Sequence, residues 1–296
     1  MVLLKHFIFI IILALIHLVI ASPAQQCQKR SPVGDHQFEL WNNYWRDDGQ
    51  PTARVHIISS DELLDYDGVP VLPARPLQPR SLIHGIDDRK EVVSNEYPFN
   101  IIRKLFIRSN TCTGSAVGPR HFMTARHCIS RKPALIKLKS KHGQYPRTYE
   151  TESYVTDIIV VQATASASCE STEDFAILIF DEPIFETEGY FGAKQFDYNF
   201  DPIFKHTGFP YMNGRIRHIH QDDIQVTGYQ QCGRGLELTT ETDINSGQSG
   251  GPLYTMENGY AVQVGVLCCY GNEYGTFFAS GMNVVSSIAY ARHNFP

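Results

Sequence analysis

The chain has 296 residues, a net charge of −5 and ordinary hydrophobic content, so it has the size of one medium globular domain with processing segments. Its basic residues are scattered and no run of Lys or Arg exceeds two. This pattern argues against a nucleic-acid-binding surface, which needs clustered cations.

The first 21 residues have the pattern of a signal peptide. Lys5 precedes an apolar run over residues 7–20, and Ala21 suits cleavage by signal peptidase. A membrane anchor is the alternative, but the run is short for a span and contains His17. We therefore expect a secreted protein whose mature form has no membrane segment.

Seven cysteines in a secreted chain predict disulfides with one cysteine left over. Cys27, closest to the signal peptide, is the expected odd one. Metal ligation is disfavoured because the chain has no pair of C-x-x-C motifs. The six cysteines expected to pair are Cys112, Cys128, Cys169, Cys232, Cys268 and Cys269.

Residues 22–80 are rich in Pro, Gln, Asp and Arg and lack a clear period, which predicts a linker or propeptide outside the core. Lys29 and Arg30 form a dibasic site, and the proline-rich stretch 71–80 ends at Arg80. The string DYDG at 65–68 lacks the later ligands of a calcium loop and predicts a turn.

From residue 81 short β-rich runs alternate with turn residues, and only the C-terminal tail has helical spacing, with Asn283 as its expected cap. Such a pattern predicts an all-β domain, either paired antiparallel barrels or a sandwich. The expected strands cover 104–109, 154–162, 175–180, 223–229, 236–241, 260–269 and 276–282.

Ser249 lies in the glycine-rich string DINSGQSGGPLY at 243–254. A serine becomes a nucleophile only when a base removes its proton and N–H groups hold the oxyanion. The glycines allow a tight turn in which the amides of Gly247 and Ser249 converge. The G-x-S-x-G elbow of α/β-hydrolases does not fit, because Gly-Gly-Pro follows and no Asp occurs after Ser249.

Two upstream residues can complete a catalytic triad. His127 lies beside Cys128, and a Cys112–Cys128 bridge closing about fifteen residues would stabilise the fold by about 3 kcal/mol. Asp174 immediately precedes an apolar, buried strand, where its carboxylate can orient an imidazole. The order His127, Asp174, Ser249 is that of one known class of serine endopeptidases.

Several motifs resemble the chymotrypsin-fold serine endopeptidases, closest to the V8-like glutamyl endopeptidase branch. The string at 81–107 resembles the mature N-terminus of the bacillary members. CTGSAVGPRHFMTARHC (112–128), the string at 174–192, TGFP (207–210) and the string around Ser249 resemble further motifs of that branch in the same order.

The resemblance implies two six-stranded antiparallel β-barrels with a C-terminal helix and the triad between the barrels. It implies domains at 1–21 (signal peptide), 22–80 (propeptide) and 81–296 (protease), with an activating protease cutting between Arg80 and Ser81. Gln248 cannot form the ion pair that an Asp makes in trypsin-like zymogens, so activation is not expected to depend on it.

The chain departs from the branch at its specificity pocket. The Thr and His that recognise a glutamate fall at Ile244 and Leu267, and a buried carboxylate without donors would lose several kcal/mol of solvation. We therefore expect an uncharged or apolar residue before the cut. Asp243 offers an alternative, because trypsin-like enzymes place their receptor for Arg or Lys six residues before the serine. The V8-like motif contains the same Asp without selecting basic residues, so we rank a basic preference below an apolar one.

Arg126 is a second departure, because the position beside the histidine is usually small. It either reaches solvent or crowds His127, which would favour a secreted, non-catalytic homologue that uses its cleft for binding. His218 and His220 alternate on one strand, but no third metal ligand is evident and an exposed basic face is expected.

Cys268 and Cys269 are not expected to bond each other, and Cys169 and Cys232 are their predicted partners. The resulting hypothesis is a secreted, monomeric serine endopeptidase that is made as a zymogen, uses no cofactor or metal, and cuts protein or peptide substrates.

Overall fold

The computed structural model describes residues 53–74, 89–107, 110–129, 137–142, 149–163, 167–199, 203–271 and 275–296. The predictions for the signal peptide, Cys27, the dibasic site and the Arg80–Ser81 bond lie outside these residues. None of the helices described is long and apolar enough to cross a membrane.

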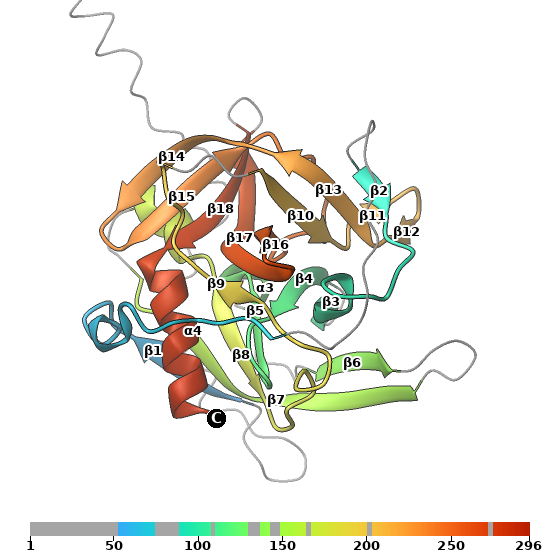
Figure 1. The fold of residues 1–296 in the computed structure, drawn as a ribbon, viewed down its shortest axis with the longest axis horizontal. Helices are drawn as coiled ribbons and strands as arrows, with labels where there is room; N and C mark the ends of the chain where they lie inside the picture. Colours follow the sequence, from blue (N-terminus) through green and yellow to red (C-terminus); the bar gives the residue numbers. More distant parts are fainter. Residues whose placement is uncertain are drawn as a thin grey trace, which may run out of the picture.

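The described strands form two large sheets and a small hairpin (Figure 1). The first sheet contains β1 (Arg54–Ile58), β3 (Ile102–Ile107), β4 (Asn110–Ala116), β5 (His121–Thr124), β6 (Lys137–His142), β7 (Tyr149–Val161) and β8 (Ala176–Phe180).

The second sheet contains β2 (Arg89–Glu91), β9 (Gly192–Ala193), β10 (Phe204–Gly208), β13 (Ile219–Ile224), β14 (Val226–Cys232), β15 (Gly235–Thr240), β16 (Pro252–Glu257), β17 (Tyr260–Gly271) and β18 (Gly275–Gly281). The hairpin is β11 (Tyr211–Met212) with β12 (Arg215–Ile216). The helices are η3 (Leu64–Tyr66), η4 (Phe99–Ile101), α3 (Arg126–Ile129), η5 (Ala167–Glu173) and α4 (Met282–Asn294).

This architecture confirms the predicted all-β fold of two antiparallel barrels with a C-terminal helix. The described sheets contain seven and nine strands rather than the predicted six each. Successive strands pair mostly antiparallel, which fits chain segments joined by short turns. β8 is buried along its whole length, as its continuous apolar sequence predicts, and it carries Asp174 to the edge of the core.

Residues 53–74 contradict the expectation that the stretch before residue 81 stays outside the core. β1 adds to the first sheet, where it pairs in parallel with β7 from Arg54 opposite Asp157 to Ile58 opposite Val161. Leu63 is fully buried, and Val71 forms a bridge to Ala193 in β9. The apolar residues of this segment are widely spaced and show no helical or strand period. The polar, proline-rich composition therefore wrongly predicted that the whole segment lies outside the core.

The disulfides confirm one prediction and correct two. Cys112 and Cys128 are bonded, as expected, with Cα atoms 6.3 Å apart. Cys169 in η5 instead bonds Cys232 at the end of β14.

Cys268 and Cys269 are bonded to each other, contrary to expectation. Adjacent side chains of a regular strand point to opposite faces, but the pairing of β17 with β18 shifts register between Leu267 and Cys269. This irregularity lets the two neighbouring sulfurs meet, and Phe277 packs against them.

The N-cap of α4 is Gly281 rather than Asn283. The backbone of Gly281 has φ +92°, and the amide of Asn283 donates to the carbonyl of Arg234. The side chain of Asn283 is buried and contacts Ser60 of the N-terminal segment. α4 therefore starts against that segment, and Figure 1 shows the two lying side by side.

Acid should destabilise this fold through buried, neutral histidines. Burial lowers the pKa of His121 from 6.5 to about 4. Between these values the unfolded chain binds a proton that the folded chain does not, so the free energy of unfolding falls as the pH falls through this window. Urea denaturation with disulfides intact should give a lower midpoint at pH 5 than at pH 7.5.

Replacing His121 by Gln should weaken this pH dependence, whereas the exposed His293→Gln should leave it unchanged. Equal pH dependence in the His121→Gln variant and the wild type would contradict the assignment.

Candidate active site

The loop that carries Ser249 joins β15 to β16 and is shaped by two glycines. Gly247 and Gly250 have φ values of +106° and +86°, which other residues rarely adopt. A Cβ atom on Gly250 would lie 2.2 Å from the carbonyl oxygen of Thr113. The backbone of the loop therefore approaches β4 more closely than any side chain would allow.

Thr113 in β4 fixes this loop to the first sheet. Its backbone amide donates to the carbonyl of Ser249 at 2.8 Å, and its hydroxyl donates to the carbonyl of Gly247 at 2.8 Å. The same hydroxyl accepts a hydrogen bond from the amide of Phe209 at 2.9 Å. Because Thr113 is fully buried, these bonds do not compete with water.

His127 and Asp174 form a direct pair. Nδ1 of His127 donates to Oδ2 of Asp174 at 2.6 Å, and the backbone amide of His127 donates to Oδ1 at 2.8 Å. Both side chains are mostly buried, at 15% and 16% exposure, which strengthens the bond. The carboxylate thus holds both the ring and the backbone of the histidine, and it leaves Nε2 as the basic nitrogen.

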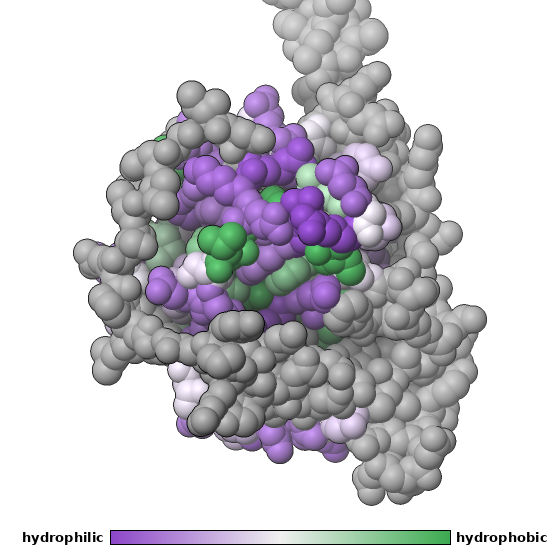
Figure 2. Space-filling view, turned by 90° about the vertical axis from the view of Figure 1, so that its right-hand side faces the viewer, coloured by the Kyte–Doolittle hydropathy of each residue, from purple (hydrophilic) through white to green (hydrophobic). Residues whose placement is uncertain are grey.

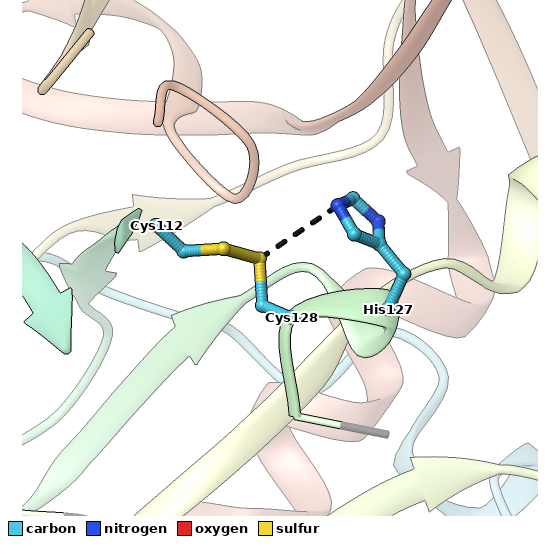
Figure 3. A group of neighbouring side chains, drawn as sticks. All are labelled: Cys112, His127 and Cys128. Atoms are coloured by element: carbon cyan, nitrogen blue, oxygen red, sulfur yellow. Dashed lines mark hydrogen bonds between the residues drawn. A yellow bond between two sulfur atoms is a disulfide. The ribbon is translucent and has the colours of Figure 1, made fainter. Parts of the chain in front are cut away.

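The Cys112–Cys128 disulfide lies beside the imidazole of His127 (Figure 3). Sγ of Cys128 lies 3.8 Å from Nε2 of His127 and 3.8 Å from the carbonyl oxygen of Ser249. The two sulfurs and the imidazole are close enough to suggest a metal site, but disulfide sulfurs are not thiolates and cannot serve as such ligands. The two cysteines form a structural disulfide that packs beside the imidazole.

The backbone amides of Gly247 and Ser249 are the donors that the sequence predicts for an oxyanion. Neither donates to an acceptor within the part of the chain that the structure describes. Gly247 is buried and Ser249 is half-buried. Unused backbone donors beside a serine have the character of an oxyanion hole.

The side chain of Arg126 does not reach solvent. It is buried at 4% exposure, and its guanidinium donates to the carbonyl of Val161 at 2.6 Å. The expectation that Arg126 reaches solvent is therefore wrong. Its side chain ties the short helix α3, which carries His127, to the end of β7.

Comparison with known proteins identifies the family and the fold. The family model described as Trypsin matches residues 86–286, more than half of the chain. The chain belongs to the trypsin family. A solved structure of a Glu endopeptidase in complex with MPD matches with a TM-score of 0.52 and 19% identity, covering 72% of this chain and 100% of that chain. At this identity the match shows the shared chymotrypsin-like fold. None of the curated proteins compared matches the chain.

Within this trypsin-family chain, Asp243 faces outward. Its side chain is 61% exposed, and its carboxylate lies 3.5 Å from Nε of Arg89 in β2. The Arg89 guanidinium also donates to Oδ1 of Asn245 at 3.4 Å. The carboxylate is thus compensated at the surface. The face around β2 and the β11–β12 hairpin is mostly polar, with small apolar patches (Figure 2).

Ile244 and Leu267 lie in one apolar cluster. Leu267 is 1% exposed and packs in the cluster that contains Phe278, and the half-buried Ile244 packs against the same cluster. The Leu267 backbone also pairs with the serine loop, since its amide donates to Gly251 and its carbonyl accepts from Gly250. The structure therefore brings these two predicted pocket residues together and leaves Asp243 outside them.

His218 and His220 do not form the exposed basic face that the sequence predicts. The His218 ring stacks on Phe209 with centroids 4.2 Å apart, and burial lowers its pKa to about 3. His220 is buried between the hydroxyl of Thr207 and the carboxylate of Asp222. These histidines pack the second sheet.

Two contributors to the site could not be found from the sequence. Thr113 lies in the motif at 112–128, but that motif does not show which groups its hydroxyl contacts, and Arg89 is far from Asp243 along the chain. Both act through contacts between distant segments, which only the fold reveals.

Removing the Thr113 hydroxyl should destabilise the serine loop. Thr113→Val keeps the volume but leaves the Phe209 amide and Gly247 carbonyl without their buried partner, at a cost of about 1–3 kcal/mol for each such group. We expect a lower urea midpoint and loss of labelling by a serine-reactive phosphonate.

Thr227→Val is the matched control, because its hydroxyl makes a similar bond to a carbonyl but is exposed. Similar effects of the two substitutions would show that the Thr113 junction has no special role.

Proposed function

We propose that the protein is a secreted serine endopeptidase, made as a zymogen, with His127, Asp174 and Ser249 as its triad. The observation that carries this proposal is the hydrogen-bonded pair of His127 and Asp174. Sγ of Cys128 contacts both the imidazole of this pair and the backbone carbonyl of Ser249. Family membership supports the hydrolysis of protein or peptide substrates. The disulfides fit an oxidising, extracellular environment.

In the proposed mechanism, Nε2 of His127 takes the proton of Ser249 as Oγ attacks the scissile carbonyl. Asp174 holds the imidazole through Nδ1 and stabilises its protonated form. The amides of Gly247 and Ser249 receive the oxyanion. His127 then protonates the leaving amine, and a water molecule hydrolyses the acyl-enzyme by the same steps.

Activation by cleavage between Arg80 and Ser81 is part of the proposal, with the mature enzyme expected to act as a monomer. The side chain of Gln248 supports an activation step that needs no ion pair at this position. Its Oε1 accepts a hydrogen bond from the backbone amide of Asn245 at 2.7 Å, so the serine loop is stabilised by a bond within itself.

A phosphonate probe tests the proposed triad on the secreted, processed protein. The wild type should be labelled at Ser249, and Ser249→Ala should not. Asp174→Asn should lower kcat by about 10⁴ because it leaves the wrong tautomer of His127. Absence of labelling in the wild type, identical to Ser249→Ala, would favour a binding protein that has lost catalysis.

The residue before the cut should be uncharged or apolar. Ile244 and Leu267 offer no donors to a carboxylate, and burying one there would lose several kcal/mol of solvation. A peptide-library digest should therefore show few cuts after Glu and few after Arg or Lys. Dominant cutting after Glu would contradict the pocket proposal, and Arg89→Gln would then test whether the nearby guanidinium recognises the carboxylate.

A further inference from the structure

Residues 53–74, which we name the N-terminal strap, lie outside the matched family domain at 86–286 yet belong to the core. The strap adds β1 to the edge of the first sheet and then runs past α4 to β9. Its buried apolar residues join the main hydrophobic cluster: Ala53, Val55, Ile58, Leu63 and Val71.

Charged groups reinforce this contact at β7. The carboxylate of Asp157 is only 3% exposed, and the strap supplies both of its basic partners. Arg54 donates to it at 3.0 Å, and Nε2 of His56 lies 2.8 Å from Oδ1. A carboxylate in so dry a position needs such compensation.

A second polar contact ties the strap to α4 and to the turn between β14 and β15. Asp67 forms an ion pair with Arg234 and accepts the hydroxyl of Ser286 at 2.7 Å. Arg292 in α4 donates to the carbonyl of Leu72 at 2.8 Å and, with its other nitrogens, to carbonyls of the protease domain. The strap is thus held by apolar, ionic and backbone contacts together.

The strap is also connected to the histidine helix. The carbonyl of Ile58 accepts the amide of Gln162, directly after Val161. The carbonyl of Val161 in turn accepts the guanidinium of Arg126, the neighbour of His127. The strap is thus linked to the helix that carries His127 through the end of β7 and the side chain of Arg126.

We propose that the strap remains bound after cleavage at Arg80, as a non-covalent second chain that the mature protease needs to keep His127 in position. This inference rests on the activation step of the proposed function. The strap contains no cysteine, and the described cysteines pair among themselves, so its attachment is not covalent. A segment bound in this way is a subunit, whereas an inhibitory propeptide leaves on activation.

The first test uses the cleaved protein, obtained by native processing or through an enteropeptidase site in place of residues 76–80. Gel filtration should elute the strap chain and the protease chain together in equal amounts, and a denaturing, non-reducing gel should separate them. Cys27→Ser serves as the control that removes any disulfide through Cys27. Elution of the strap chain on its own from the wild type would overturn the proposal.

The second test asks whether the protease chain needs the strap. The protease chain isolated in urea and returned to buffer should lose at least tenfold in phosphonate labelling, and a synthetic peptide of residues 53–74 should restore it. Full labelling without the peptide would overturn the proposal. Co-elution without any labelling of the intact complex would instead refute the proposed enzyme and leave the bound strap standing.

Leu63 and Leu64 provide a matched pair of substitutions. Leu63 is fully buried and Leu64 is 52% exposed, although they are adjacent and chemically identical. Leu63→Asp should release the strap from the cleaved protein, and Leu64→Asp should retain it. If Leu63→Asp is not secreted, co-elution of the wild-type chains decides the question. Retention of the strap by a folded Leu63→Asp variant would count against the proposal.

Discussion

The junction at Thr113 is the constraint on which the rest of the site depends. His127 lies in α3, which follows β5 of the first sheet, and Asp174 lies just before β8 of that sheet, whereas Ser249 lies on a loop of the second sheet. Thr113 holds that loop through both its amide and its hydroxyl, and the adjacent Cys112–Cys128 disulfide lies against the imidazole. A shift of about 1 Å between reacting groups can reduce a rate about a hundredfold, so a rigid, buried joint between the sheets matters for the reaction.

The sequence predicted the parts of the site that have local signals. Gly-rich turns, an Asp before an apolar strand and a His beside a Cys each leave a pattern in neighbouring residues, and the strands from residue 81 did so too. The partner of Asp243, the support of α3 and the disulfide partner of Cys169 depend on contacts across the fold. No local pattern encodes such contacts, and the bulge in β17 overrode the ordinary geometry of neighbouring cysteines.

Charge selectivity in the proposed pocket depends on which charged side chains near it lack an opposite charge. Asp243 is exposed and faces Arg89, so it offers little net field to a basic substrate side chain. Leu267 is buried in an apolar cluster beside the serine loop, and in the proposed pocket a carboxylate would find no donor on Ile244 or Leu267. The proposed preference for an apolar substrate residue would arise from the cost of burying an acidic or a basic side chain as much as from attraction to an apolar one.

The N-terminal strap alters how the family domain is stabilised. A helix as short as α3 is not stable on its own, so the position of His127 depends on what holds its ends. Asp174 anchors one side, and Arg126 anchors the other to the carbonyl of Val161. That carbonyl belongs to the part of β7 that pairs with β1. An unpaired edge at β7 would be free to twist or associate, and the strap removes this freedom next to the base that the proposed reaction needs.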